Sequence, residues 1–248
     1  MWGVFAIFPA RDAFTTPLGA GQRPAGWAAR RPAGLPACRP ERRPGEDGDA
    51  AGGRASGIVV LVPRETRFLL IRHAQSTWNA EGRWQGQANP PLSEEGRRQA
   101  ARLSRELADE RVDCVIASDL GRAAETAAIL AGVWGLTPEL DSRLRELDVG
   151  SWTGLTRDQI SRADSEALAR FESGEPDARP GGGESRRELR RRVRAAAAQI
   201  SREHAGRQIA LVAHLGTVSG LRPGTVLLHA GWCHARASEL ARPSADEP

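Results

Sequence analysis

The sequence predicts an α/β fold, a three-layer sandwich in which a mostly parallel central sheet is flanked by helices. Short apolar runs of strand length occur at 67–71, 112–117 and 208–213, and segments with helical apolar spacing lie between them. Such alternation is typical of parallel sheets, because each crossover carries the chain back through a helix. The length of 248 residues fits one domain of this kind with additional segments.

Composition divides the chain into a central domain and two ends. Residues 1–64 are rich in Ala, Gly, Pro and Arg, and turn formers recur too often there for a helix or strand to persist. We therefore expect a disordered N-terminal tail at 1–64, interrupted at most by a short strand at 58–62. One domain is expected over 65–240, followed by a disordered end at 241–248.

Capping residues and apolar spacing predict the helices. Ser93 is the expected N-cap of one helix, because the next two residues are acidic and suit the positive end of a helix. The longest helix carries six Arg between Arg186 and Arg194, which mostly lie off its apolar stripe, and we interpret them as a solvated face. This longest helix is expected at about 185–204, other helices at about 120–134 and 156–171, and a late strand at 225–232.

Charge and cysteine content argue against several classes of protein. The net charge is +4, but residues 1–57 hold eight Arg and five acidic residues, so +3 belongs to that segment and +1 to the rest. This distribution weakens the case for a nucleic-acid partner. The three Cys are widely spaced and indicate neither a disulfide framework nor a metal cluster, so a reducing cytoplasm is the expected location.

Membrane and secretion signals are weak in this sequence. No apolar run approaches the roughly 20 residues that a membrane span needs, so no membrane partner is expected. The first eight residues are apolar, but they are few and no basic residue precedes them, which makes a poor signal peptide.

Polar residues follow two of the predicted strands directly. Arg72 and His73 come after the first strand, and His214 comes after the strand at 208–213. Ligand-binding and catalytic groups gather at the carboxyl ends of strands in open α/β sheets. An Arg can hold a phosphate through bidentate hydrogen bonds, and a neutral His can attack it.

The stretch Arg-His-Ala-Gln-Ser-Thr-Trp-Asn at 72–79 resembles the Arg-His-Gly signature of the histidine phosphatase superfamily, in its phosphoglycerate-mutase-like branch. Ala74 stands where Gly is commoner. The motifs Ser-Asp-Leu-Gly-Arg-Ala around Arg122 and Leu-Arg-Glu-Leu-Asp-Val-Gly around Glu146 follow in the family's order, before the second His. The residue after that His is Leu215 instead of the family's Gly, and Gly comes one position later.

The resemblance implies a phosphoglycerate-mutase-like fold, a set of catalytic residues, no cofactor and no metal site. His73 would be the nucleophile that forms a phosphohistidine, and Glu146 would be the general acid that later activates water. Arg72, Arg122 and His214 would hold the phosphate and neutralise its charge. Three further matches, at family positions that contact the phosphate or the rest of the substrate, are Asn79, Gln85 and Gly86.

The leading prediction is a metal-independent phosphomonoester hydrolase whose partner is a small phosphorylated metabolite, such as a phosphosugar or a phosphoglycerate derivative. A cofactor-dependent phosphoglycerate mutase is the nearest alternative, although mutases carry a longer insertion between the Glu and the second His than the 68 positions from Glu146 to His214. A catalytically silent phosphate-binding module is a second alternative, and binding of nucleic acid by residues 1–57 a third. Dimers occur among such relatives, so a homodimer is possible.

Several residues lie near these motifs without a family role. His204, His229 and His234 match nothing and are expected at the surface. Glu184, in the motif Gly-Gly-Glu-Ser, is expected to cap the Arg-rich helix. Three tryptophans that could line a pocket or pack beside it are Trp78, Trp84 and Trp152.

Overall fold

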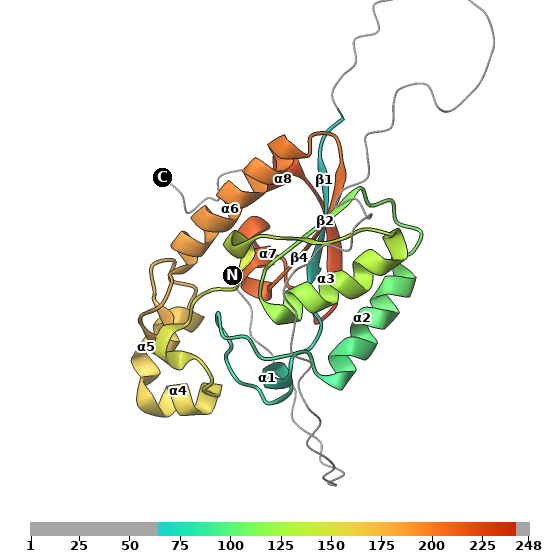
Figure 1. Ribbon diagram of the computed structural model, residues 1–248. Coiled ribbons are helices and arrows are strands. Elements are labelled where there is room, and N and C mark those ends of the chain that lie inside the picture. Colours follow the sequence, from blue (N-terminus) through green and yellow to red (C-terminus); the bar gives the residue numbers. More distant parts are fainter. Residues whose placement is uncertain (1–63, 242–248) are drawn as a thin grey trace, which may run out of the picture.

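The computed structural model describes residues 64–241, which form three layers around a five-stranded sheet (Figure 1). The strand order is β3-β2-β4-β1-β5. β1 and β2 each pair in parallel with β4, β3 pairs in parallel with β2, and β5 runs antiparallel to β1 at one edge. The predicted fold class is therefore confirmed. The strands are β1 (Arg67–Arg72), β2 (Cys114–Ala117), β3 (Glu139–Leu140), β4 (Gln208–Ala213) and β5 (Trp232–Arg236).

Helices cover both faces of the sheet (Figure 1). On one face α2 packs against α3, and on the other α6 packs against α7 and α8. The pair α4 and α5 and the short helix α1 lie toward the end of the molecule where β1 terminates. The helices are α1 (Thr77–Ala80), α2 (Glu94–Glu106), α3 (Gly121–Trp134), α4 (Arg157–Ala163), α5 (Ser165–Glu172), α6 (Arg186–Glu203), α7 (Leu215–Leu221) and α8 (Ala237–Leu240).

Alternate side chains of the central strands enter two separate cores. Phe68 and Leu70 of β1 belong to the core beneath α6, whereas Leu69 and Ile71 belong to the core beneath α2 and α3. All four are completely buried. Successive residues of a strand face opposite sides of its sheet, so a strand covered on both sides needs an unbroken apolar run. This explains why the sequence signal for β1 is a run instead of an alternation.

The capping residues define the helix ends. Ser93 is the N-cap of α2, as predicted, and its Oγ accepts a hydrogen bond from Gly96 N at 2.9 Å. α6 begins after Ser185, whose Oγ accepts from Glu188 N while the Glu188 carboxylate accepts from Ser185 N. The capping partner is therefore Glu188, and the role predicted for Glu184 is wrong.

The segment predicted as one helix at 156–171 is two helices. Asp164 lies between them with a φ of −156°, which is outside the helical region. Its carboxylate accepts a hydrogen bond from Ala167 N at 2.9 Å and so starts α5 as an N-cap. An Asp in the middle of a helical pattern competes for backbone donors in this way, and here it ends α4.

The late strand is also placed differently from the prediction. Residues 225–231 form a loop, and β5 begins only at Trp232. The apolar run that suggested a strand includes Val226 and Leu228, which are 75% and 81% exposed. The loop reaches the end of β1 at Gly231, whose carbonyl accepts from Arg72 N at 2.9 Å, and antiparallel pairing with β1 continues from Trp232.

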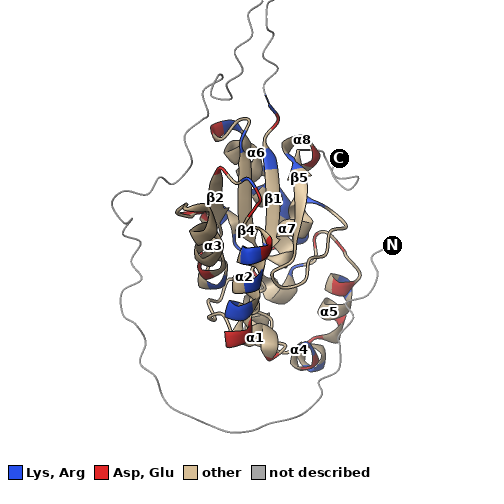
Figure 2. Cartoon of the chain, turned by 90° about the vertical axis from the view of Figure 1, so that its right-hand side faces the viewer, with Lys and Arg blue, Asp and Glu red and all other residues tan. Residues whose placement is uncertain are grey.

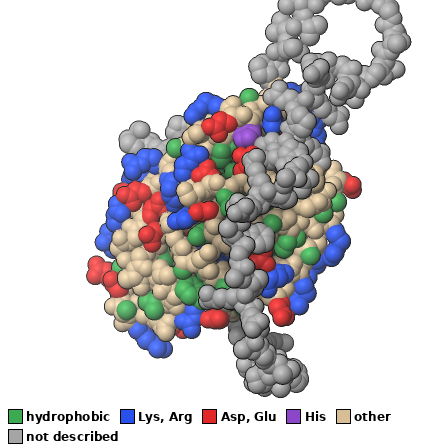
Figure 3. All heavy atoms as spheres, in the orientation of Figure 1, with side chains coloured by type: hydrophobic (Ala, Val, Ile, Leu, Met, Phe, Trp, Pro, Cys, Tyr) green, Lys and Arg blue, Asp and Glu red, His purple; other side chains and the backbone are tan. Residues whose placement is uncertain are grey.

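Charged residues lie mainly on helix surfaces, loops and strand ends (Figure 2). On the face seen in Figure 3, basic and acidic side chains are interspersed instead of being separated by sign. No helix within the described part of the chain is both long enough and apolar enough to cross a membrane. The strand expected at 58–62 and nearly all of the two ends expected to be disordered lie outside the described residues.

Two helical glycines give a test of this packing. A Cβ on Gly96 would overlap the backbone carbonyl of Gln75, whereas a Cβ on Gly132 of α3 would meet nothing within 4 Å. We expect Gly96→Ala to lower the free energy of unfolding by about 2 kcal/mol or more, because backbone must move. We expect Gly132→Ala to raise it by roughly 0.5–1 kcal/mol, because alanine is the better helix former. Urea denaturation of the two variants measures both effects, and equal effects would contradict the packing described for α2.

Candidate active site

The five residues predicted to be catalytic lie together at the carboxyl ends of β1 and β4. These strands are parallel neighbours, so His73 and His214, which follow them, are brought side by side with ring centroids 5.0 Å apart. Arg122, in the first turn of α3, donates from Nε to His73 Nε2 at 3.3 Å. The Glu146 carboxylate is close enough to raise the pKa of both Arg72 and Arg122 against the effect of their burial.

His73 is held with one defined nitrogen free to react. Its Nδ1 lies 2.6 Å from the carbonyl oxygen of Ala74, so Nδ1 carries the proton and Nε2 carries the lone pair. Burial lowers the pKa of His73 well below its usual value, and the nearby Arg122 and Arg72 cations lower it further. The ring is therefore neutral near pH 7, and its lone pair points toward Arg122.

Arg122 is almost completely buried, with 1% of its surface exposed. Nη1 donates to the carbonyl of Ala88 at 2.7 Å, and Nη2 donates to the carbonyl of Gly86 at 2.9 Å. Burial lowers its pKa to about 10, which leaves it charged near pH 7. Gly86 has a φ of +50°, and a Cβ there would press on Val149, so glycine is required where its carbonyl meets Arg122.

His214 is completely buried, and its Nε2 lies 2.9 Å from Ser118 Oγ. The Ser118 hydroxyl has no other acceptor among the described residues, so we assign its proton to this hydrogen bond. Nδ1 of His214 then carries the ring proton, and within residues 64–241 it has no partner. Burial first, and then the Arg122 cation, lower the pKa of His214 well below its usual value. The ring is a neutral donor beside His73.

Glu146 is held by two backbone amides. Oε1 accepts from Leu147 N at 2.8 Å, and Oε2 accepts from Gly216 N at 3.2 Å. A Cβ at Gly216 would overlap this carboxylate. The glycine that follows Leu215 is thus the one that the carboxylate requires, and the departure from the family pattern at Leu215 leaves this contact in place.

Arg192 of α6 fixes the backbone around Glu146. Its guanidinium forms a fork with the Glu184 carboxylate at 2.9 and 2.6 Å, and its Nη1 donates to the carbonyls of Arg143 and Arg145 at 2.8 and 3.0 Å. The prediction that the arginines of this helix form a solvated face is therefore wrong for Arg192, which orders the segment that carries Glu146, and for Arg190, which is buried. Glu184, which supplies the carboxylate of this ion pair, is the Glu of the Gly-Gly-Glu-Ser motif.

Asn79 and Gln85 converge on the buried Ser76. Ser76 Oγ lies 2.9 Å from Asn79 Oδ1 and 2.8 Å from Gln85 Oε1, and it accepts from Asn79 N. Within the described part of the chain, the amide nitrogens of Asn79 and Gln85 form no hydrogen bond. Trp84 and Trp152 pack edge to face beside Phe171, with ring centroids 5.4–6.0 Å apart.

His229 is half-buried and binds Arg72 of this cluster, so it is not simply the surface residue that was predicted. Arg72 Nη2 donates to His229 Nε2 at 2.9 Å, and the ring centroid of His229 is 6.3 Å from that of His73. Burial, and then the Arg72 cation, lower its pKa to about 4. No sequence signal marked it, because it follows no predicted strand.

His234 is exposed as predicted, and His204 is half-buried beside Cys114.

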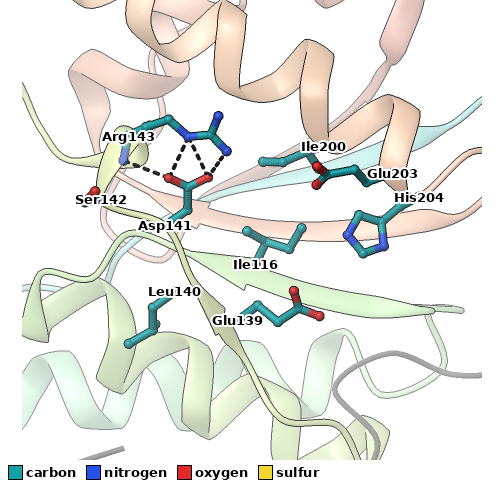
Figure 4. A pocket seen from close by; sticks show the side chains of 9 residues that line it. All are labelled: Ile116, Glu139, Leu140, Asp141, Ser142, Arg143, Ile200, Glu203 and His204. Atoms are coloured by element: carbon teal, nitrogen blue, oxygen red, sulfur yellow. Dashed lines mark hydrogen bonds and ion pairs between the residues drawn. The ribbon is translucent and has the colours of Figure 1, made fainter.

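Two hollows lie outside the His and Arg cluster. One of about 310 Å³ lies between β3 and the end of α6, where Figure 4 shows the Asp141–Arg143 ion pair at its wall. No residue of the cluster lines it. The other is an open groove of about 640 Å³ beside the Glu146 segment, and its polar lining includes Gln87, Asp148 and Arg192. Gln87 Nε2 donates to the carbonyl of Glu146 at 3.4 Å.

This chain belongs to the histidine phosphatase superfamily (branch 1), whose family model matches residues 68–226. A curated protein named probable phosphoglycerate mutase GpmB, from Salmonella choleraesuis, is 36% identical over 170 residues, which cover 68% of this chain and 79% of that protein. The family resemblance drawn from the residues at 72–79 is thereby confirmed.

Solved structures of similar proteins include phosphatases. A mycobacterial glucosyl-3-phosphoglycerate phosphatase in complex with VO3 is 33% identical, with a TM-score of 0.63, over 68% of this chain and 90% of the other. An α-ribazole phosphatase from Shigella flexneri is 26% identical, with a TM-score of 0.60, over 68% and 89% of the two chains. The similar proteins therefore include both phosphatases and a named mutase.

The neutral, buried state of His73 and His214 predicts how stability depends on pH. In the unfolded chain a His titrates near pH 6.5, whereas in the folded chain both pKa values are lower. Below about pH 6.5 the unfolded state therefore binds more protons, so the free energy of unfolding falls as the pH falls, by up to about 1.4 kcal/mol per pH unit for each His.

Urea denaturation between about pH 6.5 and about pH 5.5 checks this prediction. His73→Gln and His214→Gln should each show a shallower fall than the wild type, because glutamine does not titrate. Effects of the carboxylates are common to all three proteins and cancel in the comparison. Identical slopes in the wild type and both variants would contradict the buried neutral state.

Proposed function

We propose that this protein is a metal-independent phosphomonoester hydrolase that acts through a phosphohistidine on small phosphorylated metabolites. The observation that carries the proposal is the orientation of His73, whose Nδ1–H is bound by a carbonyl while its neutral Nε2 faces a cluster of cations. A neutral imidazole with an oriented lone pair is the state that nucleophilic attack on phosphorus requires.

In the first step His73 Nε2 attacks phosphorus and the bond from phosphorus to the ester oxygen breaks. The weak 3.3 Å hydrogen bond from Arg122 Nε to Nε2 gives way as the N–P bond forms. Arg72, Arg122 and the Nδ1–H of His214 bind the equatorial oxygens, where charge is spread in the transition state. Glu146 gives its proton to the departing alkoxide, so the alcohol leaves neutral.

In the second step water attacks the phosphohistidine. Glu146, now a carboxylate, takes a proton from the water, and the electron pair of the N–P bond returns to His73 Nε2. Inorganic phosphate leaves, and Glu146 is again protonated for the next cycle. The hydrogen bonds from Leu147 N and Gly216 N keep the carboxyl group in one place for both proton transfers.

Phosphosugars and phosphoglycerate derivatives are the substrates that the surroundings favour. The open groove of about 640 Å³ lies outside the His and Arg cluster, and Gln87 in its wall bonds the carbonyl of Glu146. The proposal takes the part of the substrate beyond the phosphate to extend toward this groove, whose Arg, Asp, Glu and Gln side chains suit hydroxyl or carboxylate groups. The glucosyl-3-phosphoglycerate phosphatase among the similar structures acts on such a compound, and this supports the same class here.

Hydrolysis of p-nitrophenyl phosphate in the presence of EDTA tests the proposal. We expect activity to survive the chelator and to fall by roughly a thousandfold or more in His73→Ala, because the covalent route is lost. His234→Ala, which changes an exposed histidine, is the matched control and should keep wild-type activity. A folded wild type that is inactive on this ester and on a panel of phosphosugars and phosphoglycerates would sink the proposal, as would full activity in His73→Ala.

A phosphoglycerate mutase is the second candidate, because the curated relative at 36% identity is named as a probable one. The two activities separate with 3-phosphoglycerate as substrate. A hydrolase releases inorganic phosphate, whereas a mutase forms 2-phosphoglycerate and depends on a bisphosphoglycerate to phosphorylate it. We expect phosphate release without isomer formation, and the reverse result would establish the mutase.

A further inference from the structure

The loop at 225–231 binds the end of β1 through four hydrogen bonds. Two involve the backbone, from Arg72 N to Gly231 O at 2.9 Å and from Ala230 N to His73 O at 3.3 Å. The other two come from the Arg72 guanidinium, which donates from Nη1 to Leu227 O at 2.8 Å and from Nη2 to His229 Nε2 at 2.9 Å. The loop therefore fixes both the backbone and the side chain of Arg72.

The contact with Arg72 fixes which ring nitrogen of His229 carries the proton. Every guanidinium nitrogen is a donor, so His229 Nε2 must carry a lone pair and its Nδ1 the ring proton. The low pKa of His229, near 4, is consistent with this neutral form. Arg72 Nε is buried and has no partner within residues 64–241, which leaves it and the second hydrogens of Nη1 and Nη2 for an anion.

His229 is a neutral acceptor, whereas the usual partner of an arginine is a carboxylate. A carboxylate at this position would form a shorter and stronger bond, but it would also cancel the charge that attracts a phosphate. Elsewhere in the described chain, arginines near the site do take carboxylates, as Arg145 does with Asp119 and Arg192 with Glu184. Among the described residues, the Arg72 side chain is bound only by a carbonyl and an imidazole, so its orientation is fixed while its charge is kept.

We propose that His229 is a positioning residue that fixes the plane of the Arg72 guanidinium for the substrate's phosphate without neutralising it. This inference deepens the proposed function and rests on it for the identity of the substrate. The positioning role can nevertheless be tested independently of hydrolysis. It predicts how the side chain at position 229 changes the affinity of the site for a phosphate anion, whether or not an ester is hydrolysed.

Three substitutions at His229 separate charge, hydrogen bonding and bulk. His229→Gln supplies a neutral acceptor with similar reach, His229→Glu supplies an acceptor with a negative charge, and His229→Met supplies neither. The measurements are the affinity for inorganic phosphate by calorimetry, kcat and KM for p-nitrophenyl phosphate, and the midpoint of thermal unfolding. His234→Gln, an exposed histidine of β5, is the control.

We expect His229→Gln and the control to bind inorganic phosphate within about threefold of the wild type. His229→Met should bind it about tenfold more weakly, because Arg72 loses its orientation. His229→Glu should lose at least as much although Arg72 keeps an acceptor, because the carboxylate competes with the anion. The loss in kcat/KM should follow the same order.

A purely structural role for His229 would lower the thermal midpoint without distinguishing glutamine from glutamate in phosphate binding. Equal phosphate affinity in His229→Gln and His229→Glu would therefore overturn the proposal, and this comparison stands even if His229→Met fails to fold. The expected order of affinities in a protein that hydrolyses no ester would support the positioning role and contradict the proposed function. A wild type that binds no inorganic phosphate would overturn both.

Discussion

The arrangement of this site depends on burying two guanidinium groups without attaching a carboxylate to either. Within the described chain, Arg72 donates to a carbonyl and an imidazole, and Arg122 donates to two carbonyls and an imidazole. Burying a charge is costly unless its hydrogen-bonding groups are satisfied. Neutral acceptors take five of the N–H groups, and the one carboxylate that lies close to both guanidiniums, that of Glu146, is hydrogen-bonded to backbone amides instead. The resulting potential makes an oxyanion the natural partner of the cluster.

Burial, and then the same positive charges, lower the pKa of His73 and of His214 and so keep both rings neutral. Arg122 lies close to both His73 and His214 and, together with burial, keeps their pKa values low. Protonation of either ring would place a third cation among the first two. The cluster can therefore keep His73, the proposed nucleophile, neutral near pH 7 without a dedicated base. The Ala74 carbonyl orients the ring of His73, and Ser118 orients the ring of His214.

The sequence predicted those parts of the site that local patterns mark. Arg72, His73 and His214 directly follow apolar strands, and the order of parallel strands in a sheet then brings them together. Arg122 and Glu146 were predicted from family motifs. Their placement beside the histidines follows because α3 begins just after β2 and the Glu146 segment follows β3, and both strands run parallel to β4 and end at the same edge of the sheet.

The missed residues act through contacts that no local pattern encodes. Arg192 orders Glu146 from a helix 46 positions further along the chain, and His229 meets Arg72 across 157 positions. His229 also lies in a run whose apolar character predicted a strand, although Val226 and Leu228 are mostly exposed. Capping was locally encoded, because Ser185 and Glu188 have the spacing of a capping box, whereas Glu184 precedes the N-cap and binds Arg192.

The position of β5 at the edge of the sheet has a consequence for the order in which the site is completed. His73, Arg122, Glu146 and His214 all precede α7, but the acceptors that hold the Arg72 side chain come from the loop that leads into β5. During synthesis, a chain that ends at α7 would contain the proposed nucleophile and proton donor with Arg72 unsupported. Pairing of the last strand with β1 is thus the event that completes the site, so a nascent or truncated chain lacks the ordered cation pair of the finished protein.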